Sequence, residues 1–397
     1  MKRTLLRILW LRSRTGKSDN TKVLAVSTEP EGKMAANLSR EYADKVNYVR
    51  PTYFGIIASA ALTVLVIVGS RNLEHFDSAL FGYTIASIVA LGAIVFRYAV
   101  WLQRPATRTY WMRGWQLFRD RKKLFKNTTN AAETIGKNLI AQNFIFKRGF
   151  TRWATHFLIM WGCLLAAAIT FPLAFGWVHF KLEGDLGYRA YLFGFPLQLM
   201  DGRSLIAWLT FHALDFTAIM VIAGCALAIH RRLTDRGAIA VQSFLLDFTP
   251  HILLLAISVS GLMLTASSLW FGGYMYAFIG LLHQATVIMT LFYLPFGKLF
   301  HIVQRPASIG VELYQSRSKE MEHAVCPRCG TMFVGQLWID DLKNVVKELG
   351  FDYRLENGRT LQDYCPRCKR IMRGLAYAGL KDRLEPVFYG TRGDEKE

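Results

Sequence analysis

Cysteine is scarce in this chain, and the way it is used argues against a disulfide-rich secreted protein. Only six cysteines occur among 397 residues. Cys163 and Cys225 stand singly in apolar runs, where a free cysteine behaves as a small packing residue. The other four form two CxxC pairs toward the C-terminal end. Paired thiols of this kind are typical of a reducing compartment.

Acidic residues are also few, with 29 Asp and Glu against 48 Lys and Arg and a formal net charge of +19. In a soluble chain this surplus would suggest a nucleic-acid partner. Here the basic residues stand beside long apolar runs, so the positive-inside rule accounts for them more simply. We therefore expect membrane lipids and no nucleic acid as contacts. Internal repeats and extended low-complexity tracts are lacking as well.

Apolar residues are abundant, at 52% of the chain with a mean hydropathy of +0.21. This composition predicts an integral membrane protein of the all-α class with six transmembrane helices. The six apolar runs lie at residues 53–70, 80–102, 153–177, 205–229, 244–270 and 273–303. Basic connectors alternate with neutral or acidic ones along the chain, which predicts that both termini are cytoplasmic.

Composition divides the chain into five segments. Residues 1–50 are basic and predicted to be cytoplasmic, and we expect no signal peptide. Three interpretations of this segment stay open: an amphipathic helix on the membrane surface, a partner-binding arm, or a partly ordered tail. Two transmembrane helices occupy 51–102 and four occupy 151–303. The connector 103–150 carries eleven Lys and Arg with aromatics at near-helical spacing, which predicts a helix at the membrane interface, compatible with a surface for a cytoplasmic partner. Residues 304–397 hold the cysteine pairs.

Two histidines mark the last apolar run. His283 and His301 are 18 residues apart, which is five turns of an α-helix and about 27 Å along its axis. Both imidazoles are therefore predicted on one face of one helix, near opposite membrane surfaces. A histidine inside a membrane span is costly and favours a functional role. Our hypothesis is bis-histidine ligation of one or two b-type haems.

The predicted topology groups the histidines by depth. His156 and His301 lie near the cytoplasmic edge and could clamp an inner haem, with His251 as the competitor of His156. His212 lies about eight residues into the fourth run and matches His283 at about nine into the sixth. These two could clamp an outer haem.

Three stretches resemble the nitrate reductase gamma subunit family of membrane cytochromes b. They read NLIAQNFIFKRGFTRWATHFLIMWGCLL, LLDFTPHILLLAISVSGLML and LLHQATVIMTLFYLPFGKLFH. The first has the basic run, histidine and WGF-like patch of the family's second helix. The second is similar to the family's Asp–Pro opening and Gly-Leu ending, and the third has its two histidines and PFxKLxH ending. The resemblance covers about residues 78–303.

The resemblance implies a five-helix cytochrome b core, here with one extra N-terminal helix, in the cytoplasmic (inner) membrane of a prokaryote. It implies electron exchange between quinone and an iron–sulfur subunit that serves a catalytic subunit, with His156, His283 and His301 as haem ligands. The family has a second ligand about ten residues after the first on its second helix, where this chain has Ala166. Either His212 replaces that ligand or the outer haem is absent.

The two CxxC pairs predict a metal site. Cys326, Cys329, Cys365 and Cys368 can supply four thiolates to a tetrahedral ion. The stretch WIDDLKNVVKELGF between them has helical periodicity and ends in glycine. We predict a small cytoplasmic zinc ribbon with an inserted helix, which docks soluble subunits. A single iron, as in rubredoxins, is the alternative.

Two other functions compete with the cytochrome. A transporter would use buried histidines as proton relays, but no inverted repeat or interrupted helix pair is recognisable. A non-redox membrane anchor would only display the zinc ribbon.

Overall fold

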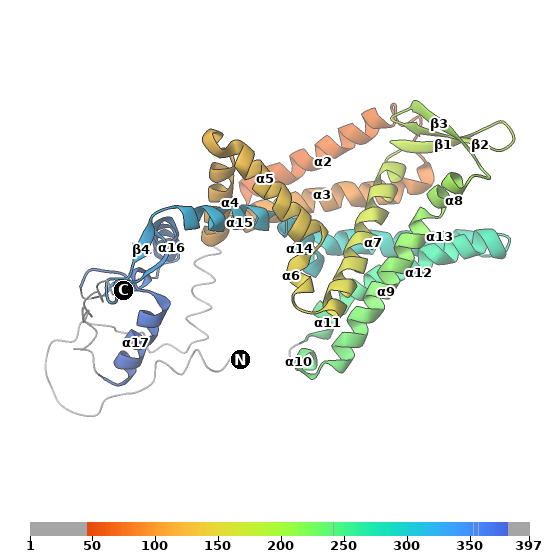
Figure 1. Ribbon diagram of the computed structural model, residues 1–397. Coiled ribbons are helices and arrows are strands. Elements are labelled where there is room, and N and C mark those ends of the chain that lie inside the picture. The colour runs from red at the N-terminus through yellow and green to blue at the C-terminus, as the bar shows by residue number, and fades with distance from the viewer. Residues whose placement is uncertain (1–45, 241, 352, 356, 380–397) are drawn as a thin grey trace, which may run out of the picture. The chain divides into compact units, whose positions relative to one another are not determined.

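The computed structural model describes residues 46–379 except 241, 352 and 356, and this part of the chain is mostly helical (Figure 1). Within it, six helices are long and apolar enough to cross a membrane, which confirms the predicted fold class. They are α2 (Val49–Gly69), α3 (Phe81–Leu102), α7 (Phe150–Ala174), α9 (Ala213–Thr234), α12 (Thr249–Trp270) and α13 (Tyr276–Phe296). Most of the predicted segment 1–50 lies outside the described residues.

Contacts between these helices run in a circuit. Helix α7 packs against α9, α9 against α12, α12 against α13 and α13 against α3, while α3 touches α7. Helix α2 packs against α3. A circuit of this kind lets side chains from several facing helices meet, which is how helix bundles build cofactor sites.

Glycines permit the tightest helix contacts. A Cβ on Gly224 of α9 would lie 2.7 Å from Cγ1 of Ile159 on α7 and 3.0 Å from the backbone nitrogen of that residue. A Cβ on Gly92 of α3 would overlap the hydroxyl of Ser59 on α2. Small residues are typical of membrane helix interfaces, because van der Waals packing drives association there.

The predicted sixth run is not one helix. Helix α13 ends at Phe296, a 3₁₀ turn (η5) covers Lys298–Phe300, and the short helix α14 begins at His301 and ends at Gln304. Pro295 lacks a backbone N–H, and the Tyr293 ring occupies the space that a side chain at position 297 would need. The prediction that His283 and His301 lie on one face of a continuous helix is therefore wrong.

The predicted fourth run is also divided. Helix α8 (Leu205–Phe211) ends just before His212, and the membrane-crossing helix α9 begins just after it. The His212 ring bonds to Asp215, one turn along, with Nδ1 2.7 Å from Oδ2. His212 thus lies at the start of the crossing helix, so its predicted position about eight residues inside a continuous span is wrong.

The connection between α7 and α8 forms an antiparallel three-stranded sheet. Its strands are β1 (Val178–Glu183), β2 (Gly187–Leu192) and β3 (Phe195–Asp201), with β2 in the centre. Gly184 and Gly194 sit at the two hairpin turns with positive φ, which glycine adopts without steric cost. Arg189 of β2 pairs with Glu183 of β1 at 2.7 Å.

The connector 103–150 is helical, as predicted for its aromatic stretch. It contains α4 (Pro105–Phe118), the 3₁₀ turn η3 (Arg121–Lys123), α5 (Leu124–Thr134), the π-helix η4 (Ile135–Ile140) and α6 (Asn143–Phe146). Helix α4 packs against α15 (Ala307–Glu320), where a Cβ on Gly114 would lie 2.8 Å from Cα of Gly310. One face of α4 is therefore covered by the C-terminal segment.

The C-terminal region combines a small hairpin with two helices. Strands β4 (His323–Val325) and β5 (Met332–Gly335) pair antiparallel, followed by α16 (Gln336–Glu348), the turn η6 (Leu361–Asp363) and α17 (Pro366–Tyr377). Helix α16 is the helix predicted between the cysteine pairs. Gly350 ends it with a φ of 80°, a left-handed conformation suited to a helix stop.

Candidate functional site

The first cysteine pair is held by a tight loop between β4 and β5. The Cys326 carbonyl accepts from the Gly330 N–H at 2.9 Å, and the Cys326 N–H donates to the Thr331 carbonyl at 3.0 Å. Gly330 has a φ of 69°, so the loop closes through a left-handed residue. These bonds turn Cys326 and Cys329 toward the same point.

The second pair stands at the start of α17. Cys365 is the N-cap of this helix, and its sulfur accepts from the Cys368 N–H at 3.4 Å. Pro366 occupies the first helical position, where its missing N–H costs nothing. The Cys365 N–H donates to the Cys326 sulfur at 3.4 Å, which joins the two pairs.

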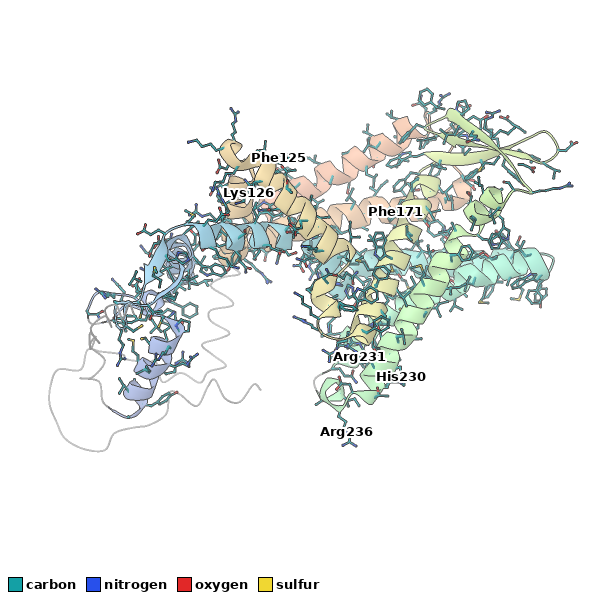
Figure 2. The ribbon with its side chains drawn as sticks, viewed as in Figure 1. Phe125, Lys126, Phe171, His230, Arg231 and Arg236 are labelled. Atoms are coloured by element: carbon teal, nitrogen blue, oxygen red, sulfur yellow. The ribbon has the colours of Figure 1, made fainter. Side chains whose placement is uncertain are left out.

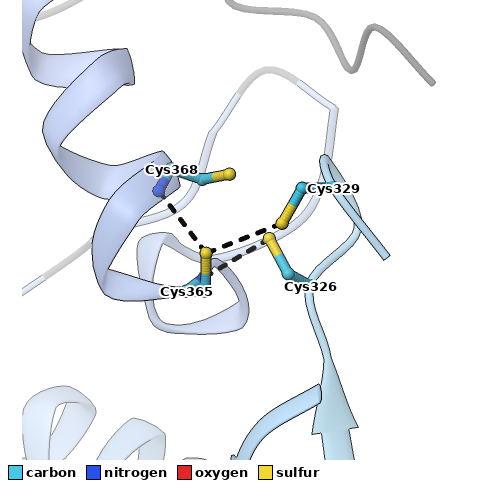
Figure 3. A group of neighbouring side chains, drawn as sticks. All are labelled: Cys326, Cys329, Cys365 and Cys368. Atoms are coloured by element: carbon cyan, nitrogen blue, oxygen red, sulfur yellow. Dashed lines mark hydrogen bonds between the residues drawn. The ribbon is translucent and has the colours of Figure 1, made fainter. Parts of the chain in front are cut away.

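The four sulfurs form one cluster, as Figure 3 shows. All four Sγ atoms lie within 4.8 Å of one another, and those of Cys329 and Cys365 are 3.7 Å apart. Zn–S bonds of about 2.3 Å in a tetrahedron require sulfurs about 3.8 Å apart. The cluster could therefore hold a metal ion, and its donor set suits zinc or a single iron.

The electrostatics of the cluster favour a cation. Hydrogen bonds with Thr331 lower the pKa of the Cys329 thiol to about 6. Burial raises the pKa of Cys368, and hydrogen bonds with the other cysteines raise it further. Close thiolates resist full deprotonation unless a positive ion offsets their charge, which is what a bound metal provides.

The sulfurs are also the hydrophobic core of this region. Cys326, Cys365 and Cys368 are buried with Tyr364 and Met372, and Phe333 packs against them with a few other partly buried side chains. A core this small supplies little folding energy by itself, so a bound metal would contribute much of it.

His156, the predicted inner ligand on α7, is oriented by a buried glutamine. Its Nδ1 lies 2.9 Å from Oε1 of Gln142, so the ring donates there and keeps the Nε2 lone pair free. Gln142 is 2% exposed and has a φ of 55°, rare for a residue with a side chain. It follows the π-helix η4, and π-helical turns often occur at functional sites. Sequence reasoning missed Gln142, because nothing in its local pattern reveals a left-handed backbone.

His301, the predicted partner of His156, begins α14 and is exposed. Its Nδ1 donates to the Lys298 carbonyl at 2.6 Å. Both His301 and Arg305 are close enough to His156 to interact with it electrostatically. The break after α13 thus leaves His301 near His156, although the two are far apart in sequence.

His283 and His212, the predicted outer ligands, are hydrogen-bonded to α12 at different positions along its axis, His212 through Asp215. The His283 Nδ1 lies 2.9 Å from the Ser260 hydroxyl. His212 bonds to Asp215, which accepts from the Thr265 hydroxyl at 2.8 Å. Ser260 and Thr265 are five residues apart on one helix, about 7.5 Å along its axis. His212 and His283 therefore do not lie at equal depth along α12, and equal depth was the reason for pairing them. Ligation of an outer haem by these two residues stays a prediction.

His251, the alternative inner ligand, opens α12 with its Nδ1 2.9 Å from the Asp247 carbonyl. It faces the charges of Arg231 and Arg232. In all five candidate histidines Nδ1 is hydrogen-bonded, and within residues 46–379 as described none has a hydrogen bond at Nε2. Metal-ligating histidines are oriented in this way, so the residues present fit axial ligation of haem iron.

A charged cluster joins the C-terminal region that holds the four cysteines to the connector 103–150. Nε and Nη2 of Arg113 on α4 donate to the two carboxylate oxygens of Asp341 on α16 at 2.9 and 2.8 Å. Tyr314 of α15 donates its hydroxyl to Asp341 at 2.8 Å. The hydrogen bond to Asp341 raises the pKa of Arg113, while burial, with Asp341 beside it, raises the pKa of Tyr314.

Comparisons with family models, with curated proteins and with solved structures returned no match for this chain.

Proposed function

We propose that the chain is a membrane cytochrome b subunit that passes electrons between quinol in the membrane and a soluble iron–sulfur partner with its catalytic subunit. The observation that carries this proposal is the arrangement of His156 and His301. In the described part of the chain each has its Nδ1 bonded to a protein oxygen and no hydrogen bond at Nε2, and His301 acts electrostatically on His156. A b-type haem held there would supply one-electron oxidation and reduction.

The chain's own residues hold and orient that pair. Gln142 fixes the tautomer and the plane of the His156 ring, and the Lys298 carbonyl does the same for His301. Arg305 lies over the Phe144 ring, its guanidinium carbon 4.9 Å from the centroid, and adds positive charge beside His156. A cation near this site would stabilise the negatively charged groups that a haem carries.

The four-cysteine cluster supports the second half of the proposal. We infer that it binds zinc, with iron as the alternative, and orders a small domain that docks the soluble partner. Helix α16, which follows β5 of that domain, is joined to α4 by the partly buried hydrogen bonds between Arg113 and Asp341. Partner docking would thereby act on a helix connected directly to the membrane helices.

Haem reduction by quinol tests the function. The purified full chain in liposomes is mixed anaerobically with a reduced naphthoquinone, and the haem absorption bands are followed with time. We expect reduction by the quinol and reoxidation by the corresponding quinone. Haem that dithionite reduces but that no quinol or quinone affects would contradict a quinone-linked role while leaving haem binding intact.

A further inference from the structure

Three arginines gather at the end of the helix bundle where α7 begins and α9 ends. Arg152 lies in the first turn of α7, and Arg231 and Arg232 lie in the last turn of α9. The charges of Arg152 and Arg232 repel that of Arg231. Figure 2 shows Arg231 at the same end of α9 as Arg236 of α10 (Arg236–Ile239).

The guanidinium groups of Arg231 and Arg232 are incompletely paired. The Nε atoms of Arg231 and Arg232 are buried, and neither has a hydrogen-bond partner in the described part of the chain. Asp247 lies 3.3 Å from Arg232 but is shared with Lys298. Asp235 is the acidic group that offsets the charge of Arg231. Within the described residues, the carboxylates identified beside these three arginines and Lys298 are those of Asp235 and Asp247.

Arg231 and Arg232 are partly buried, whereas Arg152 is exposed. Partly buried cations without enough counter-charge are costly, so the geometry around Arg231 and Arg232 favours a bound anion. A guanidinium presents two parallel donors that match phosphate oxygens. Basic pockets between membrane helices are sites of this kind for anionic lipid headgroups.

An exposed apolar edge beside the arginines indicates where the anion comes from. The short helix α11 (Phe244–Asp247) carries Phe244, Leu245 and Leu246, which are 65%, 74% and 57% exposed. Its last residue, Asp247, is the one that pairs with Arg232. Apolar residues on a helix outside the membrane-crossing segments are typical of insertion at the lipid headgroup level.

We propose that Arg152, Arg231 and Arg232 bind the phosphate of an anionic phospholipid, with the α11 apolar edge inserted among neighbouring acyl chains. The site lies at the membrane surface and is separate from the cysteine cluster. It does not depend on the proposed electron-transfer function.

Lipid retention by the full-length protein tests the site. The protein is reconstituted in nanodiscs of phosphatidylcholine doped with phosphatidylglycerol, then released and examined by native mass spectrometry. We expect retained phosphatidylglycerol on the wild type and about thirtyfold weaker retention on the Arg231→Gln/Arg232→Gln variant, because each arginine near the surface contributes about a fivefold preference. The control is Arg236→Gln, an exposed arginine at the same end of the bundle, which should retain lipid as the wild type does.

Four outcomes with folded variants would overturn the proposal. They are equal retention by the double variant and the wild type, equal loss in Arg236→Gln, displacement of the lipid by millimolar inorganic phosphate alone, and haem loss that accompanies lipid loss. The last would assign the arginines to the haem. If the double variant fails to fold, lipid retention by the wild type still tests the proposal. Equal retention of phosphatidylcholine and phosphatidylglycerol by the wild type would exclude a site for anionic headgroups.

Discussion

Removing the Asp341 carboxylate should loosen the C-terminal domain from the connector. Asp341 is 6% exposed and accepts two bonds from Arg113 and one from Tyr314. Breaking a fully buried ion pair costs about 3–5 kcal/mol. The Arg113 side chain is 35% exposed, so water can replace part of the loss. We therefore expect Asp341→Asn to lower the free energy of opening of α16 by about 2–3 kcal/mol. This is about a 30- to 150-fold increase in the equilibrium constant for opening.

Hydrogen exchange of the α16 amides, measured by mass spectrometry on the metal-loaded full chain, reports this opening directly. The matched control is Asp340→Asn. Asp340 is exposed and, among the described residues, accepts only from Gln336 of the same helix, at 2.8 Å, so loss of its carboxylate should change exchange by less than about threefold. A double-mutant cycle with Arg113→Ala should give a coupling of about 1–3 kcal/mol. Equal exchange in Asp341→Asn and Asp340→Asn would refute the reasoning.

Three further predictions concern the remaining sites. Metal analysis should give about one zinc per chain, lost in Cys326→Ser together with protection of the α17 amides; a preparation that contains only iron would favour the rubredoxin alternative. Gln142→Leu should weaken haem retention about 10- to 100-fold by releasing His156, while Gln142→Glu keeps an acceptor and most of the haem; equal retention in both variants would contradict the orienting role. Burial lowers the pKa of His179, and the nearby His75, Lys181 and Arg71 lower it further. The folded state therefore favours the neutral form of His179 and loses stability as pH falls below about 6.5. Proteolysis at the β1–β3 sheet should therefore increase toward pH 5, and a rate independent of pH would contradict this.

The apolar runs predicted most of the membrane helices because hydrocarbon requires long, uncharged helices whatever the rest of the fold does. The cysteine cluster was equally readable, since two CxxC pairs need only come together to make a four-sulfur site. Both features depend on local composition and spacing, which the sequence shows directly.

The continuity of the helices could not be predicted from the sequence in the same way. Eighteen residues between His283 and His301 fit one helix in spacing, but Pro295 and the packing of Tyr293 at Gly297 end α13 earlier. Hydropathy does not register such a break, because the residues on either side are equally apolar. The ion pair between Arg113 and Asp341 was invisible for another reason, since it joins residues 228 positions apart.

The haem spectrum of the purified full chain tests the central claim most directly. A reduced-minus-oxidised spectrum with haem quantification is recorded for the wild type, His156→Ala and His251→Ala, all expressed with ample haem. We predict low-spin b-type bands with at least about one haem per chain, loss of the inner haem in His156→Ala and its retention in His251→Ala. A colourless wild type, or haem lost in His251→Ala and kept in His156→Ala, would contradict the account.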